Sequence, residues 1–348
     1  MNTLKLVKPC VRALRAYEAK EIPCRVKLDA NESPYTASDA LLRGISKRLR
    51  NTPLNRYPDP EGKKLKAVLA KRHRVRSDHL LLGNGSDELI ALLVTTFGGP
   101  VLYPVPTFSM YGIIARGLGE RTVEVRLDKA YDLDVGRMQT AIRKHRPKIV
   151  FLSSPNNPTG NSFSPDRILE ILAHSPGVVV VDEAYGPFSS SRSFVSRLRD
   201  HRNLVVLHTL SKIGLAALRV GYMVTSREIT SEVNKVRLPF NVNALSQAVA
   251  EEALSKHGGI EDDIVRIMEE RKRLADGMSR VPGIRVLPSD ANFIMFQVPE
   301  PVSVYRQLLR DGVLVRNLHP AIPGSLRVTV GRPGENRAFL RAIRKVRL

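Results

Sequence analysis

The sequence predicts an α/β fold with a mostly parallel sheet, followed by a smaller α+β domain. Short apolar runs recur between residues 65 and 225, and helical sequence separates most of them. This alternation is typical of a sheet that helices cover on both faces. After residue 238 the pattern changes to a long helical segment followed by short strands and helices. A length of 348 residues also favours two domains, or one large domain with an appendage.

We therefore divide the chain into an N-terminal arm (1–30), a large α/β domain (31–238) and a small C-terminal domain (239–348). The arm combines a short helical pattern with a strand-like stretch at 25–28, and Ser38 is a candidate cap for the first helix that follows. In the large domain we expect helices at 38–49 and 65–73, a helix that residues 83–87 open and that runs to 97, a brief apolar run at 79–82, and strands at 101–103, 121–125, 148–152, 178–181, 204–208 and 220–224. In the small domain we expect one helical segment over 244–278, helices at 303–310 and 335–345, and strands at 284–287, 293–296, 313–315 and 326–330.

The formal net charge of +21 raises the question of a nucleic-acid partner. The basic residues are spread along the whole chain, and no recognition-helix, zinc-finger or aromatic RNA-binding signature accompanies them. We therefore expect no nucleic-acid partner. The charge would still raise the local concentration of anionic small molecules.

Membrane and metal functions also lack support in the sequence. No apolar run approaches the ~20 residues of a membrane span, and the N-terminus has no apolar core of a secretory signal. The two cysteines, Cys10 and Cys24, cannot form a disulfide framework or a four-ligand metal site. We expect a cytoplasmic protein with no membrane partner and no metal.

Four polar motifs follow apolar runs, where ligands bind in sheets of this kind. Residues 83–87 (Gly-Asn-Gly-Ser-Asp) lie between a predicted strand and a helix and suit a phosphate group, since backbone N–H groups and the helix dipole face it there. An ordinary helix cap is the alternative interpretation. Residues 154–160 (Ser-Pro-Asn-Asn-Pro-Thr-Gly) form a rigid loop able to aim an amide at a ligand, although an Asn-Pro turn needs no ligand.

Asp182 ends a fully apolar run, and a buried carboxylate needs a cationic or proton-donating partner. A protonated pyridine nitrogen is one such partner. A metal bound by Asp182 and Glu183 is the rival interpretation, but neighbours on a strand point to opposite faces. Lys212 follows the next run, beside a hydroxyl, where partial burial suits Schiff-base chemistry.

In this order the motifs resemble those of the fold-type-I PLP-dependent aminotransferases, over essentially the whole chain. Finer motifs resemble the histidinol-phosphate aminotransferases: Leu-Asp-Ala-Asn-Glu-Ser-Pro at 28–34, Asn-Arg-Tyr-Pro-Asp-Pro at 55–60, Gly-Asn-Gly-Ser-Asp-Glu at 83–88, Pro-Thr-Phe-Ser-Met-Tyr at 106–111 and Leu-Arg-Val-Thr-Val-Gly at 326–331. The family usually has Asn-Glu-Asn-Pro where this chain has Asn-Glu-Ser-Pro.

The resemblance implies the fold-type-I fold, the cofactor pyridoxal 5'-phosphate (PLP) and a set of site residues. Lys212 would bind PLP as a Schiff base and shuttle the substrate proton, with Asp182 at the pyridine nitrogen and Tyr185 at the phenolic oxygen. The remaining cofactor residues would be Asn157 at the phenolic oxygen, Phe108 on the ring face, Gly85, Ser86, Ser211 and Arg219 at the phosphate, and Tyr57 from a second subunit. Arg327 would bind the anionic end of the substrate, assisted by Arg316, and Tyr17 and Asn31 would line the pocket.

The reaction that the resemblance implies is reversible transamination of L-histidinol phosphate with 2-oxoglutarate in histidine biosynthesis, by a homodimer. It would yield imidazole acetol phosphate and L-glutamate. An aromatic or broad-range aminotransferase, a threonine-phosphate decarboxylase and a non-catalytic protein that kept the fold are the alternatives. One departure concerns Arg219, which lies seven residues after Lys212 where the family more commonly has eight. This spacing leaves the path of the intervening loop open.

Overall fold

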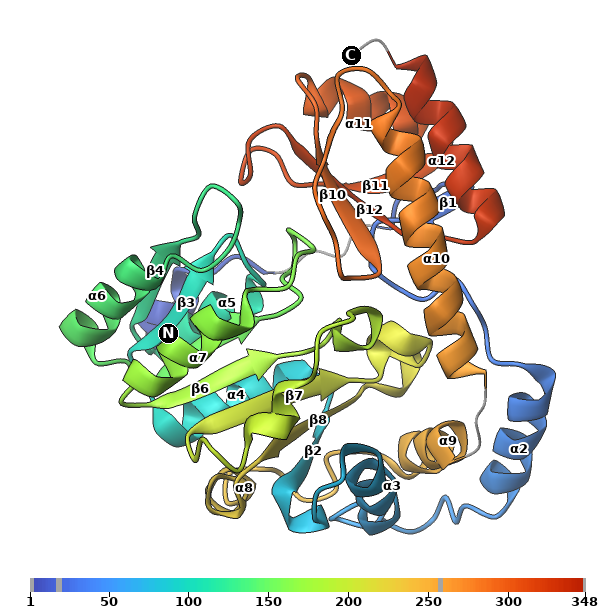
Figure 1. Ribbon diagram of the computed structural model, residues 1–348. Coiled ribbons are helices and arrows are strands. Elements are labelled where there is room, and N and C mark those ends of the chain that lie inside the picture. Colours follow the sequence, from blue (N-terminus) through green and yellow to red (C-terminus); the bar gives the residue numbers. More distant parts are fainter. Residues whose placement is uncertain (1–2, 17–20, 256–258, 347–348) are drawn as a thin grey trace.

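The computed structural model describes residues 3–16, 21–255 and 259–346. The larger of its two sheets has seven strands in the order β2-β8-β7-β6-β5-β3-β4 (Figure 1). The pairs β3–β4, β3–β5, β5–β6 and β6–β7 are parallel, and only β8 runs against its two neighbours. The strands are β2 (Leu80–Asn84), β3 (Val101–Val105), β4 (Thr122–Arg126), β5 (Ile149–Ser153), β6 (Val178–Asp182), β7 (Leu204–Thr209) and β8 (Val220–Thr225). The mostly parallel α/β sheet predicted from the sequence is confirmed.

Both faces of this sheet are buried, which explains why its strands are apolar throughout. In β6, Val179 and Val181 belong to one hydrophobic core, while Val178 and Val180 belong to a second core on the opposite face. Because alternate side chains point to opposite faces, each core receives every second residue. The α-helices of this part of the chain are α2 (Asp39–Arg50), α3 (Lys63–His73), α4 (Ser86–Phe97), α5 (Met110–Leu118), α6 (Val135–His145), α7 (Pro165–His174), α8 (Arg227–Asn234) and α9 (Ala244–Ser255).

A five-stranded sheet in the order β1-β11-β12-β10-β9 forms the upper part of the molecule in Figure 1. Its strand β1 comes from the N-terminal region and pairs in parallel with β11, and the other pairs are antiparallel. The strands are β1 (Val26–Leu28), β9 (Arg285–Val286), β10 (Phe293–Gln297), β11 (Val313–Asn317) and β12 (Ser325–Thr329), and the helices are α10 (Ile260–Ser279), α11 (Pro301–Arg310) and α12 (Pro333–Lys345). Short helical turns complete the chain: η1 (Thr3–Leu6), α1 (Pro9–Arg12), η2 (Ser77–His79), η3 (Gly186–Phe188), η4 (Phe194–Arg197), η5 (Ser211–Ile213) and η6 (Ala216–Leu218).

The helices agree with the sequence pattern except at one place. Ser38 caps α2 as predicted, since its hydroxyl accepts a hydrogen bond from the backbone N–H of Leu41 at 3.3 Å. The single helical segment expected over 244–278 is wrong, because α9 ends at Ser255 and α10 begins at Ile260. Gly259 precedes α10 with a φ of +80°, a left-handed conformation that glycine adopts without steric cost. Among the described residues, no helix is both long and apolar enough to cross a membrane.

Candidate active site

The candidate site lies where strands β5, β6 and β7 end. These strands are parallel neighbours, so their carboxyl ends meet at one edge of the sheet. Ser153 at the end of β5 is in register with Asp182, and Asp182 is in register with Leu207 of β7. The polar loop 154–160 and the turn that carries Lys212 both leave the sheet at this edge.

Asp182 is a buried carboxylate with a hydrogen bond to each oxygen. Its Oδ1 accepts from the backbone N–H of Ala184 at 3.0 Å, and its Oδ2 accepts from the hydroxyl of Tyr111 at 2.7 Å. Burial raises the pKa of Asp182 to about 6, against the opposing effects of the Tyr111 hydrogen bond and the Lys212 charge. A buried carboxylate of this kind gains from a cationic partner.

Lys212 lies on the turn η5, directly after β7. Its Nζ is 5.7 Å from the centroid of the Tyr185 ring, and Tyr185 is buried. The Tyr185 hydroxyl accepts a hydrogen bond from Nδ2 of Asn31 at 2.9 Å. The lysine amine, a phenol and the Asp182 carboxylate thus come together at the end of two adjacent strands.

Arg219 curls back toward Ser211 in spite of the short spacing after Lys212. Gly214 and Arg219 both adopt left-handed backbone conformations, at φ of +98° and +51°. The chain therefore turns twice within a few residues, and Nη1 of Arg219 donates to the hydroxyl of Ser211 at 3.2 Å. The seven-residue spacing keeps these two predicted phosphate residues in contact.

The turn before α4 completes a cradle beside Arg219. Gly85 has a φ of +82°, and a Cβ built on it would lie 2.7 Å from Nη2 of Arg219. A Cβ on Gly221 of β8 would lie 2.4 Å from the backbone nitrogen of Ser86. Both glycines therefore allow backbone N–H groups at the start of α4, the arginine and the Ser211 hydroxyl to lie close together, which suits a phosphate.

Arg327 lies on β12 and joins the small sheet to the site. Its Nη1 donates to Oδ1 of Asn157 at 2.6 Å, and its Nη2 donates to the carbonyl oxygen of Asp29 at 2.8 Å. The guanidinium also lies over the ring of Phe293, 5.1 Å from its centroid. Arg327, the predicted substrate-binding residue, is thus hydrogen-bonded directly to Asn157, a predicted cofactor-binding residue. Arg316 is in register with Arg327 on β11, with an exposed side chain.

Asn31 connects the arm to the same site. It adopts a left-handed conformation at φ +55°, and its backbone N–H donates to the hydroxyl of Thr329 at 3.0 Å. Its side chain reaches Tyr185 at the same time. Asp29 of the arm and Asn31, the first residue after it, therefore contact the predicted substrate arginine and the tyrosine beside Lys212.

Asn156 holds the loops that present Phe108 and Asn157. Its Oδ1 accepts from the hydroxyl of Thr107 at 2.7 Å, and its Nδ2 donates to the carbonyl oxygen of Pro106 at 2.9 Å. Since Asn156 is fully buried and bonded on both sides, it fixes the two loops relative to one another.

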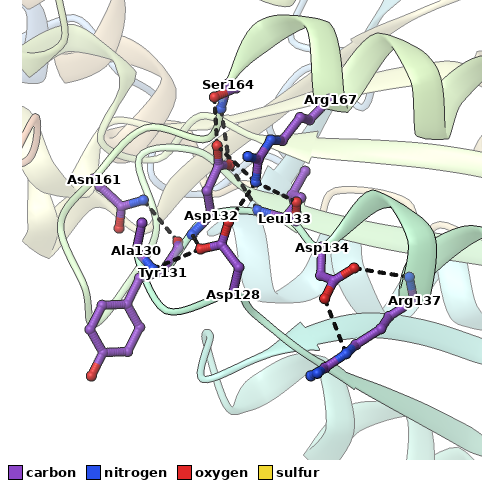
Figure 2. Close-up of polar contacts among 10 residues, drawn as sticks. All are labelled: Asp128, Ala130, Tyr131, Asp132, Leu133, Asp134, Arg137, Asn161, Ser164 and Arg167. Carbon is purple, nitrogen blue, oxygen red and sulfur yellow. Dashed lines mark hydrogen bonds and ion pairs between the residues drawn. The ribbon is translucent and has the colours of Figure 1, made fainter.

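The segment after Asn157 is anchored in turn by the loop between β4 and α6 (Figure 2). Asn161 donates to the carbonyl oxygen of Tyr131 at 2.9 Å, and the hydroxyl of Ser164 donates to Asp132 at 2.5 Å. Arg167 donates to Asp128 at 2.7 Å. These contacts pin both ends of the segment that leads from the site into α7.

One predicted site residue, Tyr57, does not join this group in the single chain. Tyr57 is 82% exposed and stacks on Phe240, with ring centroids 4.6 Å apart. Tyr17 lies outside the described residues. Of the other predicted residues, Arg316 is exposed on β11, and the Phe108 ring contacts that of Tyr111 with centroids 5.5 Å apart.

The sequence prediction missed the role of two buried groups. Tyr111 contacts Asp182, although its motif at 106–111 had drawn attention only to Phe108. Glu183, directly after the end of β6, accepts hydrogen bonds from the hydroxyl of Ser193 at 2.6 Å and from the backbone N–H of Phe194 at 2.7 Å, so its two oxygens have partners other than those of Asp182. This geometry does not favour a metal shared by Asp182 and Glu183.

The residues fit PLP. A buried carboxylate, an adjacent lysine amine and a phosphate cradle that a single Cβ would fill are the three features that the pyridine ring, the aldehyde and the phosphate of PLP require. They lie on adjacent strand ends of one sheet.

Comparisons with known proteins agree with this chemistry. A model of the aminotransferase class I and II family matches residues 25–343. The histidinol-phosphate aminotransferase of Aquifex aeolicus is 44% identical over 341 residues, which span 96% of each chain. The structure of the enzyme of that name from Clostridium acetobutylicum has a TM-score of 0.85 at 25% identity and covers 92% of this chain and 98% of its own. The structure of the histidinol-phosphate aminotransferase from Sinorhizobium meliloti in complex with pyridoxal-5'-phosphate has a TM-score of 0.87 at 22% identity. It covers 97% of this chain and 96% of its own, and it supports the fold alone. The chain belongs to the class I and II aminotransferase family, in the branch whose curated members are named histidinol-phosphate aminotransferases.

Proposed function

We propose that this aminotransferase uses PLP to exchange an amino group between L-histidinol phosphate and 2-oxoglutarate, forming imidazole acetol phosphate and L-glutamate in histidine biosynthesis. The observation that supports the proposal is the hydrogen bond from Arg327 to Asn157, because it brings a guanidinium able to bind an anion to the loop after β5, next to the strand end that carries Asp182. The names of the curated relatives supply the substrate.

The residues that would hold PLP follow from their chemistry. Bound PLP supplies an electron sink for bond breaking at the α-carbon of the substrate. Asp182 would face the protonated ring nitrogen as an anion. Ser86, Ser211 and Arg219 would hold the phosphate, with Gly85 leaving room for it.

Two side chains have donors to spare for the phenolic oxygen of the cofactor. Asn157 uses its Oδ1 to accept from Arg327, which leaves its Nδ2 as a donor. The Tyr185 hydroxyl accepts from Asn31 and keeps its own proton to donate. Phe108 would cover one face of the ring.

Lys212 would carry the proton between the α-carbon of the substrate and the cofactor. An amine released from covalent attachment at this position can accept and return a proton. The Tyr185 ring beside it limits the volume in which Nζ can move.

Arg327 would bind the anionic group of each substrate in turn. Its guanidinium is a planar fork that matches a carboxylate or a phosphate in a bidentate manner. One site could then accept glutamate and histidinol phosphate in alternate half-reactions. Asn31, Arg316 and Tyr17 would contribute to the same pocket.

A homodimer in the cytoplasm is part of the proposal. Tyr57 is 82% exposed in the single chain and stacks on Phe240, and Leu54, three residues before it, is 78% exposed, so apolar surface is exposed here. Surfaces of this kind mark interaction sites. A second copy would cover them and bring Tyr57 to the cofactor phosphate of its partner.

A substrate panel tests the proposal. Purified protein supplied with PLP should show the visible absorbance of the bound cofactor, and Lys212→Ala should lose the band that depends on the lysine. The protein should transfer the amino group of histidinol phosphate to 2-oxoglutarate. Good turnover of aromatic amino acids without turnover of histidinol phosphate would refute the substrate assignment, and release of CO2 from threonine phosphate would identify a decarboxylase.

A further inference from the structure

Tyr111 is a buried phenol that the proposed reaction does not yet use. It is the second residue of α5 and has no exposed surface. Its ring stacks on Phe151 of β5 with centroids 4.6 Å apart and planes 4° apart. The edge of Phe108 meets it at 5.5 Å and 86°. Packing on two sides leaves the phenol one orientation.

That orientation aims the hydroxyl at Asp182. The hydroxyl donates to Oδ2 at 2.7 Å, while Oδ1 accepts from the backbone of Ala184. A carboxylate with one donor on each oxygen cannot rotate without losing both bonds, and each oxygen keeps a lone pair for a further partner. The two contacts thus set the plane of the carboxylate.

The same contact favours the charged form of Asp182. Burial opposes that charge, and the Tyr111 hydrogen bond works against the effect of burial. The Tyr111 pKa lies well above its usual value because of burial and the nearby Asp182 charge, so the phenol stays a donor. Only an ionised Asp182 can pair with a protonated ring nitrogen.

We propose that Tyr111 is a positioning residue that holds Asp182 oriented and ionised toward the cofactor nitrogen. The proposal rests on the function proposed above. A ring that only filled space at this position would be replaced by phenylalanine without consequence for Asp182, so the hydroxyl is the group to test.

Tyr111→Phe is the test variant and Tyr103→Phe the matched control. Tyr103 is buried in the same core, with its ring centroid 6.3 Å from that of Tyr111, but its hydroxyl donates to Glu124 at 2.9 Å. The Asp182 carboxyl carbon is titrated by 13C NMR in the cofactor-free protein. Its pKa should rise by about one unit in Tyr111→Phe, as expected for one lost hydrogen bond to a charged group, and should not move in Tyr103→Phe.

Cofactor affinity gives an independent readout. Tyr111→Phe should weaken PLP binding by roughly tenfold, because a shift of one pKa unit in Asp182 corresponds to a tenfold change in an equilibrium constant. In an Asp182→Asn background the Tyr111→Phe change should cost nothing further, because the two residues act as one unit. An unchanged Asp182 titration together with unchanged PLP affinity in folded Tyr111→Phe would overturn the role.

The contact between Tyr111 and Asp182 can still be tested if Tyr111→Phe does not fold or if the protein does not bind PLP. If Tyr111→Phe does not fold, 3-fluorotyrosine at position 111 keeps the shape and strengthens the donor, and it should lower the Asp182 pKa; no shift would overturn the role. If the protein fails to bind PLP, the proposed function fails, while the titration of the cofactor-free protein still tests the contact between Tyr111 and Asp182.

Discussion

A half-buried histidine, His73, predicts how the stability of the protein depends on pH. His73, the last residue of α3, shares a 2.9 Å hydrogen bond with the hydroxyl of Tyr222. Its ring lies 4.7 Å from that of His208. Burial, with the nearby charge of Arg72, lowers the pKa of His73 from 6.5 to about 4.

The sign and size of the effect follow from that shift. As the pH falls through 6.5 the unfolded chain binds a proton at residue 73 before the folded protein does. The stability that the neutral imidazole contributes is therefore present above pH 6.5 and is lost between pH 6.5 and 4. At 1.36 kcal/mol per pKa unit the full loss is about 3 kcal/mol, of which about 2 kcal/mol falls between pH 7 and pH 5.

Protonation of Glu183 changes the unfolding free energy in the opposite direction, so the pH dependence of the wild-type protein alone does not isolate the effect of His73. Burial raises its pKa to about 7, and the folded state binds the extra proton between pH 4.5 and 7. This contribution to stability is lost as the pH rises through that range. The difference in unfolding free energy between the wild type and His73→Gln does not contain the Glu183 contribution, because Glu183 is present in both proteins. The glutamine amide can still form a hydrogen bond with Tyr222.

Urea unfolding at pH 7, 6 and 5 measures the difference. The unfolding free energy of the wild type relative to His73→Gln should fall by about 2 kcal/mol from pH 7 to pH 5. Tyr222→Phe is the control, because it removes the hydrogen bond at a cost of about 1 kcal/mol but leaves the His73 imidazole half-buried. A difference between wild type and His73→Gln that stays constant over this pH range would refute the reasoning.

The other predictions concern the candidate site. Gly85→Ala should weaken PLP binding at least tenfold by equilibrium titration, because its Cβ would displace Arg219 and a hydrogen bond from a charged group contributes about 1.5–3 kcal/mol; unchanged affinity would contradict the cradle. Arg327→Lys should raise KM for 2-oxoglutarate by roughly tenfold to a hundredfold, since a charged hydrogen bond contributes about 1.5–3 kcal/mol, and steady-state kinetics would show an equal KM if the fork were not used. Lys212→Arg should keep a positive charge yet lose transamination, and residual turnover near the wild-type rate would remove the lysine from the chemistry.

The strands that carry the site were predictable because burial on both faces leaves a simple pattern. The run predicted at 178–181 forms β6 (Val178–Asp182), and the run predicted at 204–208 forms β7 (Leu204–Thr209). A polar residue after such a run lies at the carboxyl edge whatever the details of packing. The sequence alone therefore predicts that Asp182 and Lys212 lie near one another.

The apolar pattern does not predict contacts that depend on how a helix packs against the sheet. Tyr111 and Asp182 are 71 residues apart, and their bond depends on how α5 sits against β5. Periodicity predicts that the helix buries one face but not which atom of the buried ring meets a carboxylate. The bend that returns Arg219 to Ser211 was likewise hidden, because it needs a left-handed arginine that propensity disfavours.

The arm shows the same division between local pattern and long-range partner. Residues 25–28 read as a strand from their own sequence, and the structure forms β1 there. Its partner is 287 residues away, since Val26 is in register with Val313. Alternation fixes which side chains of a strand are buried but contains nothing about the strand beside it. The consequence is functional, because pairing with β11 brings the following residues, Asp29 and Asn31, to Arg327 and Tyr185. The geometry of the proposed substrate site thus depends on a pairing that a single sequence does not specify.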